Sequence, residues 1–427
     1  MTAALTSVQD ENQSLTEIAR QLFEELATAT GDGVGITREC YSDGENTAIE
    51  IVRRTAEKHG LVTSFDAAAN FLIRHPSDDG QMPALIIGSH LDSVPQGGNY
   101  DGAAGVIAGL LCLIQLMRTG QRPQSPIRIL SMRGEESAFY GRANIGSRVL
   151  FGGLNEADLA AKCRGTGRTL REALASVGAA VERISAQERL IDPASVTGFL
   201  ELHIEQGPVM IAREIPTAVV TGIRGNIRHR RITCRGGAGH SGAVPRWLRK
   251  DAVFALSDLI MRLDEHWQAL LARRLDLVIT TGIVATDPNE HAISRIPGEV
   301  SFSFEVRSQS HDTLETFYEL FRSECRAIAT QRGVTFEFDD RVYTEPARMD
   351  ETMIRRLVRA SERVGTTGEL LASGAGHDAA VFANEGVPSG MIFVRNANGS
   401  HNPHEAMDIG DFMKGVDILF SALFDGD

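Results

Sequence analysis

Cysteine is scarce in this sequence, and long apolar runs are missing. The five cysteines are odd in number, scattered along the chain and never in CxxC spacing, which argues against a disulfide framework and a thiolate metal site. No run of about 18 apolar residues occurs, and no basic segment with a long apolar stretch stands at the N-terminus. We therefore expect a protein of the reducing cytoplasm, without an export signal or a transmembrane segment.

Basic residues are also in deficit. Lysine and arginine together number 43 against 56 aspartates and glutamates, so the formal net charge is −13. Such a chain repels a phosphate backbone, which disfavours nucleic acid as a partner and favours small diffusible substrates. The segment from Gly236 to Gly242 lacks the Lys-Ser/Thr ending of a phosphate loop, and no GxSxG segment offers a serine nucleophile. Nucleotide-binding and serine-hydrolase functions are therefore disfavoured.

Polar residues that could act in catalysis or metal binding follow an apolar run at residues 84–87. That run ends at Gly88, as is typical of a buried parallel strand whose carboxyl end opens into a functional loop. We expect His90 and Asp92 to lie on this loop. Asp101 follows, just before an apolar helix predicted over residues 103–117. An arginine in an earlier loop, Arg38, is interpreted as a solvated charge.

The same arrangement recurs later in the chain. A strand predicted over residues 127–132 is followed by Glu135 and Glu136, and alternation near residue 203 places Glu201, His203 and Glu205 on one strand face. Alone, each feature has a structural alternative: Glu135-Glu136 could be a solvated acidic pair and Asp101-Gly102 a turn.

Taken together, these groups predict a metal site. Imidazoles and carboxylates at several strand ends suit Zn²⁺, Mn²⁺ or Co²⁺, and a bridging aspartate would let them hold two ions. Glu135 is then the candidate general base, and Asp92 the candidate acceptor that orients a ligating imidazole. The five candidate ligands are His90, Asp101, Glu136, His203 and His401. His404 is a competing candidate for the last position.

A second domain is expected in the middle of the chain. Strand, helix, strand, strand and helix patterns occupy residues 221–235, 251–271, 277–283, 300–307 and 314–330. We therefore predict an α/β catalytic domain, with a mixed sheet flanked by helices, over residues 1–220 and 332–427. A smaller α+β domain over residues 221–331 interrupts it.

Motifs spread over nearly the whole chain carry a family resemblance. In order, they are Gly88-Ser-His90-Leu-Asp92-Ser-Val, Gly98-Asn-Tyr-Asp101-Gly, Glu135-Glu136, Glu201-Leu-His203-Ile-Glu-Gln206-Gly-Pro, Gly239-His240-Ser-Gly and Ser373-Gly-Ala-Gly-His377-Asp. At these segments the sequence resembles the M20-type dinuclear metallohydrolases. Within them it is similar to the amidase, hydantoinase and carbamoylase branch, which is favoured because His203 stands where the family's peptidases usually have a carboxylate.

The resemblance implies a separate role for each candidate site residue. It implies one ion held by His90, Asp101 and His203, a second held by Asp101, Glu136 and His401, and Glu135 as general base. It also implies a lid domain that dimerises. It implies that Gln206 and Arg307 bind the substrate carboxylate. His240 would reach the partner subunit's site and stabilise the oxyanion there. Ser294 and His377 are further implied substrate contacts.

The implied activity is a metal-dependent amidohydrolase of a small carboxylate. It would cleave the carbamoyl or ureido C–N bond of an N-carbamoyl-L-amino acid, allantoate or 3-ureidopropionate. The alternative is an amidase of N-acyl amino acids with the same metal site. Two departures from the branch concern the substrate: Ser294 lies in the 288–298 segment where an asparagine is usual, and Arg395-Asn396 stands where Pro-Ser is common.

Overall fold

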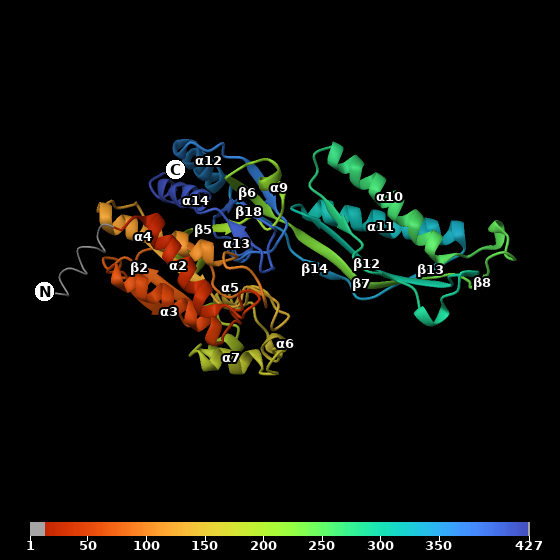
Figure 1. Ribbon diagram of the computed structural model, residues 1–427, viewed down its shortest axis with the longest axis horizontal. Helices are drawn as coiled ribbons and strands as arrows, with labels where there is room; N and C mark the ends of the chain where they lie inside the picture. The colour runs from red at the N-terminus through yellow and green to blue at the C-terminus, as the bar shows by residue number, and fades with distance from the viewer. Residues whose placement is uncertain (1–12, 426–427) are drawn as a thin grey trace. The chain divides into compact units, whose positions relative to one another are not determined.

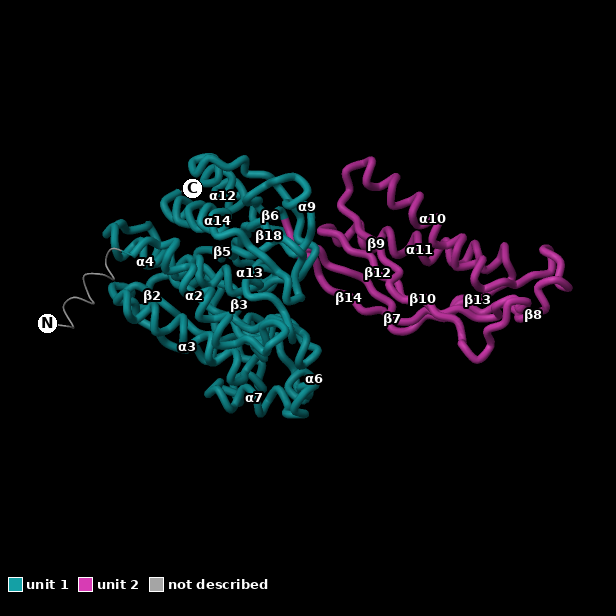
Figure 2. The backbone as a smooth tube through the Cα atoms, in the orientation of Figure 1, with its two compact units in different colours: residues 1–221, 348–427 teal, residues 222–347 magenta. Residues whose placement is uncertain are grey.

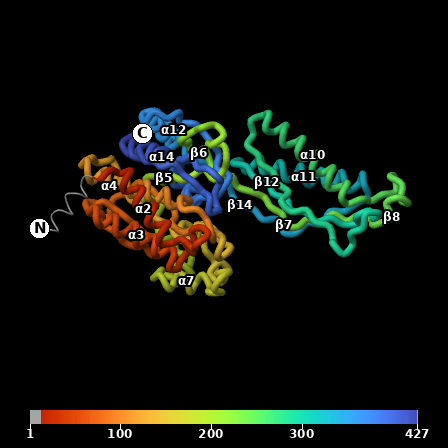
Figure 3. Tube along the Cα trace, in the orientation of Figure 1, coloured from red at the N-terminus to blue at the C-terminus, as the bar shows by residue number. Residues whose placement is uncertain are grey.

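The computed structural model describes residues 13–425, which divide into two compact units (Figures 1 and 2). Unit 1 comprises residues 1–221 and 348–427, and unit 2 comprises residues 222–347. The chain leaves unit 1 after its first segment, builds unit 2 and returns to unit 1, as the colours of Figure 3 trace. Among the described residues, no helix is both long and apolar enough to cross a membrane.

Unit 1 is built on a mixed sheet that has nine strands among the described residues, in the order β1-β2-β4-β3-β5-β17-β6-β15 with β16 beside β6. β3, β4, β5 and β17 run parallel to their neighbours in this group, whereas β1, β2 and β6 pair antiparallel. This confirms the predicted α/β class with a mixed sheet. The strands are β1 (Val62–Phe65), β2 (Phe71–Arg74), β3 (Ala84–His90), β4 (Ile127–Met132), β5 (Val196–Ile204), β6 (Thr217–Ile223), β15 (Ala347–Arg348), β16 (Leu370–Ser373) and β17 (Ser389–Val394).

Helices pack on both faces of this sheet, so all of β3 and all of β5 except Thr197 are buried. One face packs against α2 (Leu15–Thr30), α3 (Asp43–Lys58), α4 (Ala103–Thr119), α12 (Glu351–Val364) and α14 (Ile409–Ala422). The other face packs against α5 (Ile145–Leu150) and α13 (Asp378–Asn384), where Phe382 stacks on Phe199 at 4.1 Å between ring centroids. Polar side chains inside the central strands are buried and paired: the hydroxyl of Ser89 on β3 donates to Oε1 of Glu201 on β5 at 3.0 Å.

The remaining elements of unit 1 are short. They are α6 (Glu156–Leu159), α7 (Leu170–Ser176), α8 (Val181–Ser185), α9 (Val209–Ala212), the 3₁₀ turn η1 (Pro193–Ser195) and the small ladder of β18 (Asn396–Ala397) with β19 (Ala406–Met407). The β18–β19 ladder closes the loop that carries His401.

Unit 2 has its own sheet and core. Among the described residues the sheet has six strands, in which β7 lies between β12 and β13, with β9, β10 and β14 at the margins. Helices α10 (Ala252–Ala272) and α11 (His311–Arg332) pack on its apolar face. The strands are β7 (Gly225–Arg235), β9 (Val278–Thr280), β10 (Val284–Ala285), β12 (Glu299–Ser308), β13 (Thr335–Phe338) and β14 (Val342–Thr344). A separate ladder joins β8 (Gly239–His240) to β11 (Arg295–Ile296), and the 3₁₀ turns are η2 (Arg246–Leu248) and η3 (Pro288–Glu290).

The far limit of unit 2 lies later in the chain than residue 331, where the sequence pattern placed it. β13 and β14 follow helix α11, and both pair antiparallel with β7. Because these strands complete the unit 2 sheet, the chain returns to unit 1 only at residue 348.

Candidate metal and catalytic site

Four neighbouring strands deliver the candidate groups to one edge of the unit 1 sheet. β3 ends at His90, β4 is followed by Glu135 and Glu136, β5 carries His203, and β17 leads into the loop of His401. The carboxyl ends of parallel strands share a sheet edge, and functional groups of α/β proteins gather there. One detail differs from expectation: His90 is the last residue of β3 rather than a loop residue, because its backbone stays in register with Met132 of β4.

Asp101 stands at the centre of the cluster and uses its two oxygens differently. Oδ1 lies 3.2 Å from Nε2 of His203 and 3.5 Å from Nε2 of His90. Oδ2 lies 3.6 Å from Nε2 of His401, which is itself 3.1 Å from Oε1 of Glu136. Two groups of potential ligand atoms, His90-Asp101-His203 and Asp101-Glu136-His401, are each compact enough to hold one ion.

The two buried imidazoles are held in the tautomer that metal binding requires. Nδ1 of His90 lies 3.1 Å from the carbonyl oxygen of Asp92, and Nδ1 of His203 lies 3.0 Å from the carbonyl oxygen of Ile204. A carbonyl only accepts hydrogen bonds, so each Nδ1 carries a proton and each Nε2 is the atom that can ligate a metal once the imidazole is neutral. Nitrogen and oxygen donors in this arrangement fit a divalent metal site.

Burial and mutual attraction shape the ionisation of these groups. Burial opposes the charge of Asp101, but His203 and His90 outweigh it and hold the pKa of Asp101 well below its usual value. Burial likewise opposes the charge of His90, whereas hydrogen bonds to Asp101 and Asp92 hold its pKa well above the usual value. The hydrogen bond to Glu136 raises the pKa of His401 to about 9 despite partial burial. The site therefore favours ionised carboxylates that face cationic groups.

Glu135 has a different environment from the candidate ligands. Its carboxyl group is buried, with Oε2 at 3.8 Å from Nε2 of His90 and Oε1 at 3.1 Å from the side-chain amide of Asn144. Burial raises its pKa well above the usual value; His90 opposes this rise, while Glu136 and Asp378 add to it. A carboxyl group with a raised pKa beside a candidate metal site suits a role in proton transfer.

Asp92 fastens the acidic loop to the end of β3. Its Oδ1 accepts the backbone N–H of Glu135 and its Oδ2 accepts the backbone N–H of Glu136, both at 3.1 Å. The same carboxylate lies 3.4 Å from Nδ1 of His90. One fully buried side chain thus fixes three of the candidate groups relative to one another.

Gly102 allows Asp101 to approach His90 closely. Its φ is +66° and its ψ is −49°, a combination that favours glycine, and a Cβ added there would lie 2.4 Å from ring atoms of His90. The turn between Asp101 and α4 therefore excludes a side chain at this position.

A second set of polar residues supports Asp101 from the side of the last loop. Oδ2 of Asp101 accepts hydrogen bonds from the side-chain amide of Gln206, at 2.7 Å, and from the hydroxyl of Ser400. Glu405 in turn accepts the backbone N–H groups of Tyr100 and Asp101 at 2.8 and 3.1 Å. Sequence reasoning assigned no role to Ser400 or Glu405. Their only signal was a position within five residues of His401.

Arg38 is the clearest departure from the sequence interpretation. It is fully buried rather than solvated, and its guanidinium donates to Oδ1 of Asn99 at 3.1 Å. Burial lowers its pKa to about 10, while the charges of Glu405, Asp92 and Asp101 oppose that fall. Local sequence could not reveal this, because the partners lie about sixty residues away in the chain. Arg38 is a buried counter-charge to the acidic site.

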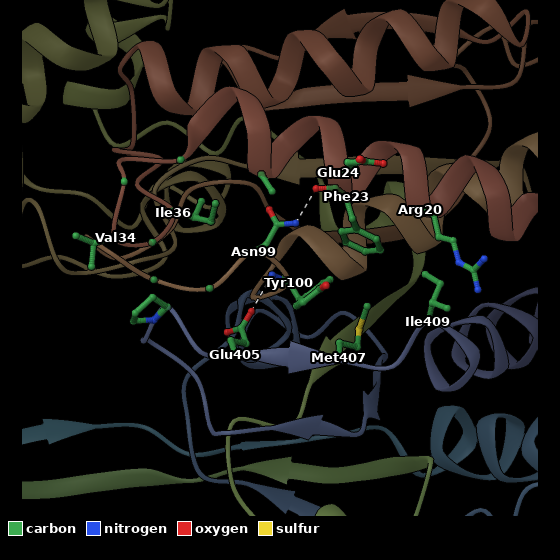
Figure 4. Close-up of a pocket in the computed structure, with 17 residues that line it drawn as sticks. Arg20, Phe23, Glu24, Val34, Ile36, Asn99, Tyr100, Glu405, Met407 and Ile409 are labelled. Atoms are coloured by element: carbon green, nitrogen blue, oxygen red, sulfur yellow. Dashed lines mark hydrogen bonds between the residues drawn. The ribbon is translucent and has the colours of Figure 1, made fainter.

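A cavity of about 520 Å³ lies beside the same segment. Its wall includes Asn99, Tyr100 and Glu405, and α2 contributes Phe23, whose backbone carbonyl accepts the Asn99 amide (Figure 4). Because Glu405 also accepts the backbone N–H of Asp101, this cavity lies beside a residue that supports the candidate ligands rather than beside the ligands themselves.

His377 lies against the cluster without joining the two groups around Asp101. It is buried, its ring centroid is 4.4 Å from that of His203, and its Nε2 lies 2.9 Å from the hydroxyl of Ser373. Burial, with the nearby charges of His203 and His90, holds its pKa well below the usual value. His404 is exposed and belongs to neither group, whereas His401 does.

The three remaining predicted residues belong to unit 2. His240 is exposed, and Ser294 is close by because the backbone N–H of Ser241 donates to its carbonyl oxygen. Arg307 lies toward the other end of β12, opposite Asn226, and its guanidinium is 3.0 Å from Glu305. Unit 2 thus brings His240 and Ser294 together but keeps Arg307 apart from them.

The protein is an α/β protein whose His, Asp and Glu side chains at the carboxyl edge of a mixed sheet fit a divalent metal site. The family model described as Peptidase family M20/M25/M40 matches residues 86–425, so the chain belongs to this family. It is a hydrolase that acts on carbon–nitrogen bonds.

Individual relatives agree over nearly the full length. The chain is 28% identical over 402 residues to an N-carbamoyl-L-amino-acid amidohydrolase of Paenarthrobacter aurescens, covering 94% of this chain and 95% of the relative. It is 30% identical over 393 residues to an allantoate amidohydrolase of Escherichia coli (strain K12), covering 91% and 92%. The crystal structure of an amidase of the hydantoinase/carbamoylase family from Burkholderia multivorans matches with a TM-score of 0.85 and 27% identity, covering 96% and 97%.

Proposed function

We propose that this protein is a dinuclear metal-dependent amidohydrolase that cleaves the carbamoyl or ureido C–N bond of a small carboxylate. The observation that carries the proposal is the geometry of Asp101, whose two oxygens face two separate groups of candidate ligands. Similarity to relatives named for N-carbamoyl-L-amino acids and allantoate supports the substrate class. Candidate compounds are N-carbamoyl-L-amino acids, allantoate and 3-ureidopropionate.

The proposed ligands are His90, Asp101 and His203 for one ion, with Asp101, Glu136 and His401 for the other. Bound Zn²⁺, Mn²⁺ or Co²⁺ would polarise the scissile carbonyl and acidify a water molecule. Glu135 would accept the proton of the attacking water at Oε2 and return it to the leaving nitrogen. Asp92 keeps Glu135 and Glu136 in place through their backbone N–H groups.

Substrate binding is proposed for residues of both units. Arg307 and Gln206 would bind the substrate carboxylate, with Ser294 and His377 as further contacts. His240 suits the stabilisation of an oxyanion, because its Nδ1 accepts the backbone N–H of Gly242 at 3.2 Å. In the neutral imidazole the proton is then on Nε2, which can donate to a developing negative charge.

We further propose a homodimer formed through unit 2. His240 lies beyond the end of the β7–β12 pair at which Arg235 faces Glu299, whereas Arg307 lies within β12 near the other end, and Figure 1 places β8 and β14 at opposite ends of this unit. At about 3.3 Å per strand residue, the length of β12 separates them by roughly 25 Å, too far for one small substrate to touch both. Both can serve one site only if they come from different subunits.

Exposed apolar side chains in unit 2 support the same proposal. Phe254 and Met261, seven residues apart and hence on one face of α10, are 59% and 60% exposed, and Trp247 is 81% exposed. A second copy of this chain would remove them from water. The five cysteines are all buried free thiols, which is compatible with the proposed cytoplasmic location.

A substrate panel tests the proposed reaction. The purified protein, stripped and then loaded in turn with Zn²⁺, Mn²⁺ and Co²⁺, would be assayed on N-carbamoyl, N-formyl and N-acetyl amino acids, allantoate and 3-ureidopropionate. We expect ammonia release from carbamoyl or ureido compounds, and a Glu135→Gln variant slower by about 10² to 10⁴ in kcat. Release of a carboxylic acid from N-acyl amino acids, without ammonia from the carbamoyl series, would favour the alternative amidase. Turnover of no compound would reject both.

A further inference from the structure

Asn144 contacts Glu135 through both its backbone and its side chain. The backbone N–H of Asn144 donates to the carbonyl oxygen of Glu135 at 2.9 Å, and its side-chain amide donates to Oε1 of Glu135 at 3.1 Å. Asn144 has a φ of +53°, in the left-handed region that asparagine tolerates better than most residues. The turn between β4 and α5 therefore folds the amide back onto the carboxylate.

A second carboxylate fixes the orientation of that amide. Nδ2 of Asn144 also lies 3.3 Å from Oδ1 of Asp378, which accepts the hydroxyl of Ser147 at 2.5 Å. Asp378 is fully buried at the start of α13. Rotation of the amide by 180° would bring its carbonyl oxygen against two carboxylates, so the NH₂ group is held toward both.

The consequence is that the two oxygens of Glu135 are no longer equivalent. Oε1 is engaged by Asn144, whereas Oε2 faces Nε2 of His90 at 3.8 Å, on the side of the candidate ligands. We propose that Asn144 is a positioning residue that reserves Oε2 of Glu135 for proton transfer, with Asp378 and Ser147 holding Asn144 in place. This inference rests on the proposed function, in which Glu135 is the general base.

A purely structural role for Asn144 makes different predictions. If Asn144 served only the left-handed turn, glycine would replace it without loss, because glycine adopts positive φ freely. If Asn144 served only to fill space, aspartate would be the best substitute, because it has the same shape and also tolerates this conformation. Positioning through hydrogen bonds predicts that both variants lose activity and that Asn144→Asp is less active than Asn144→Gly. The reason is that a carboxylate at this place would face the carboxylates of Glu135 and Asp378.

The test compares Asn144→Gly and Asn144→Asp in the metal-loaded protein, with Glu214→Gly as control. Glu214 is exposed and has a similar φ of +56°. On the most rapidly hydrolysed compound of the panel, we expect Asn144→Gly to lower kcat by about tenfold to a hundredfold, with KM and metal content unchanged. Asn144→Asp should lose more than Asn144→Gly, and Glu214→Gly should match the wild type.

The possible outcomes distinguish the positioning role of Asn144 from the proposed role of Glu135 as general base. Wild-type kcat in Asn144→Gly, or a faster Asn144→Asp than Asn144→Gly, would overturn the positioning role while a slow Glu135→Gln keeps the proposed function. A loss of bound metal that accounts for the whole fall in kcat would also overturn it, since Asn144 would then act on the ligands. Full activity of Glu135→Gln would instead remove the proposed general base, and the inference with it.

Discussion

Nε2 of His203 lies 3.2 Å from Oδ1 of Asp101, and the same nitrogen accepts the backbone N–H of Gly102 at 3.2 Å. Nε2 of His203 therefore lies beside both Gly102 and Asp101, the residue that joins the two groups of candidate ligands. This arrangement makes Asp101 the one side chain whose loss should affect both groups, whereas each histidine should affect only its own.

Substitutions at Asp101 and His401 should differ in their effect on metal content. We expect Asp101→Asn to reduce binding of both ions, because a neutral amide oxygen is a weaker ligand and is shared by both sites. His401→Ala should remove only the ion held with Glu136. Elemental analysis of the purified variants measures this. Equal losses in the two variants would contradict a bridging role for Asp101.

Gly102 and Gly120 flank α4 and offer a comparison for substitution by alanine. Both have a φ of +66°, but ψ is −49° at Gly102 and 8° at Gly120, so only Gly120 has the left-handed helical conformation, in which alanine costs about 1 to 2 kcal/mol. A Cβ at Gly102 would meet the ring of His90 at 2.4 Å, whereas a Cβ at Gly120 would meet nothing within 4 Å. We expect Gly102→Ala to lower metal content and activity well beyond Gly120→Ala. Similar activity in the two variants would show that the His90 contact does not matter.

Metal binding by the stripped protein should strengthen with increasing pH. The pKa of His401 is raised to about 9, chiefly by its hydrogen bond to Glu136, and the imidazole must lose its proton before it can ligate. Between pH 7 and 9, affinity for Mn²⁺ should therefore rise by up to about tenfold per pH unit from this group. Competition with a chelator at three pH values measures it. His401→Ala should release about one proton fewer on binding; an unchanged proton count would contradict the prediction.

Mixing two inactive variants can test whether His240 acts on the partner subunit's site. A heterodimer of Glu135→Gln and His240→Ala protomers contains one site with both substitutions and one with neither. Refolding an equal mixture should therefore recover about a quarter of wild-type activity if His240 acts in trans. Each variant refolded alone is the control. No recovery, with heterodimers demonstrated by differently tagged protomers, would place His240 in its own subunit's site.

Local sequence patterns predicted the strands and helices of unit 1 better than the contacts of its buried polar side chains. The apolar runs that became β3, β4 and α4 were readable from the sequence, because burial on both faces of a sheet requires continuous apolar segments. The family motifs pointed to the residues that the fold then brings to one edge. Burial of Arg38 and the contacts of Asn144 and Glu405 could not be read in this way. Each depends on a partner, such as Asn99 for Arg38 or Asp378 for Asn144, that is distant in sequence.

The passage of the chain through unit 2 before it returns to unit 1 has a consequence for the order of assembly. During synthesis, His90, Asp101, Glu136 and His203 emerge before unit 2, whereas His401 emerges after it. Of the two proposed ligand sets, the nascent protein would therefore hold His90, Asp101 and His203 early, and complete the set with His401 only when its last segment has packed into unit 1. Binding at the proposed site of His401 would thus require that the segment after unit 2 has packed into unit 1.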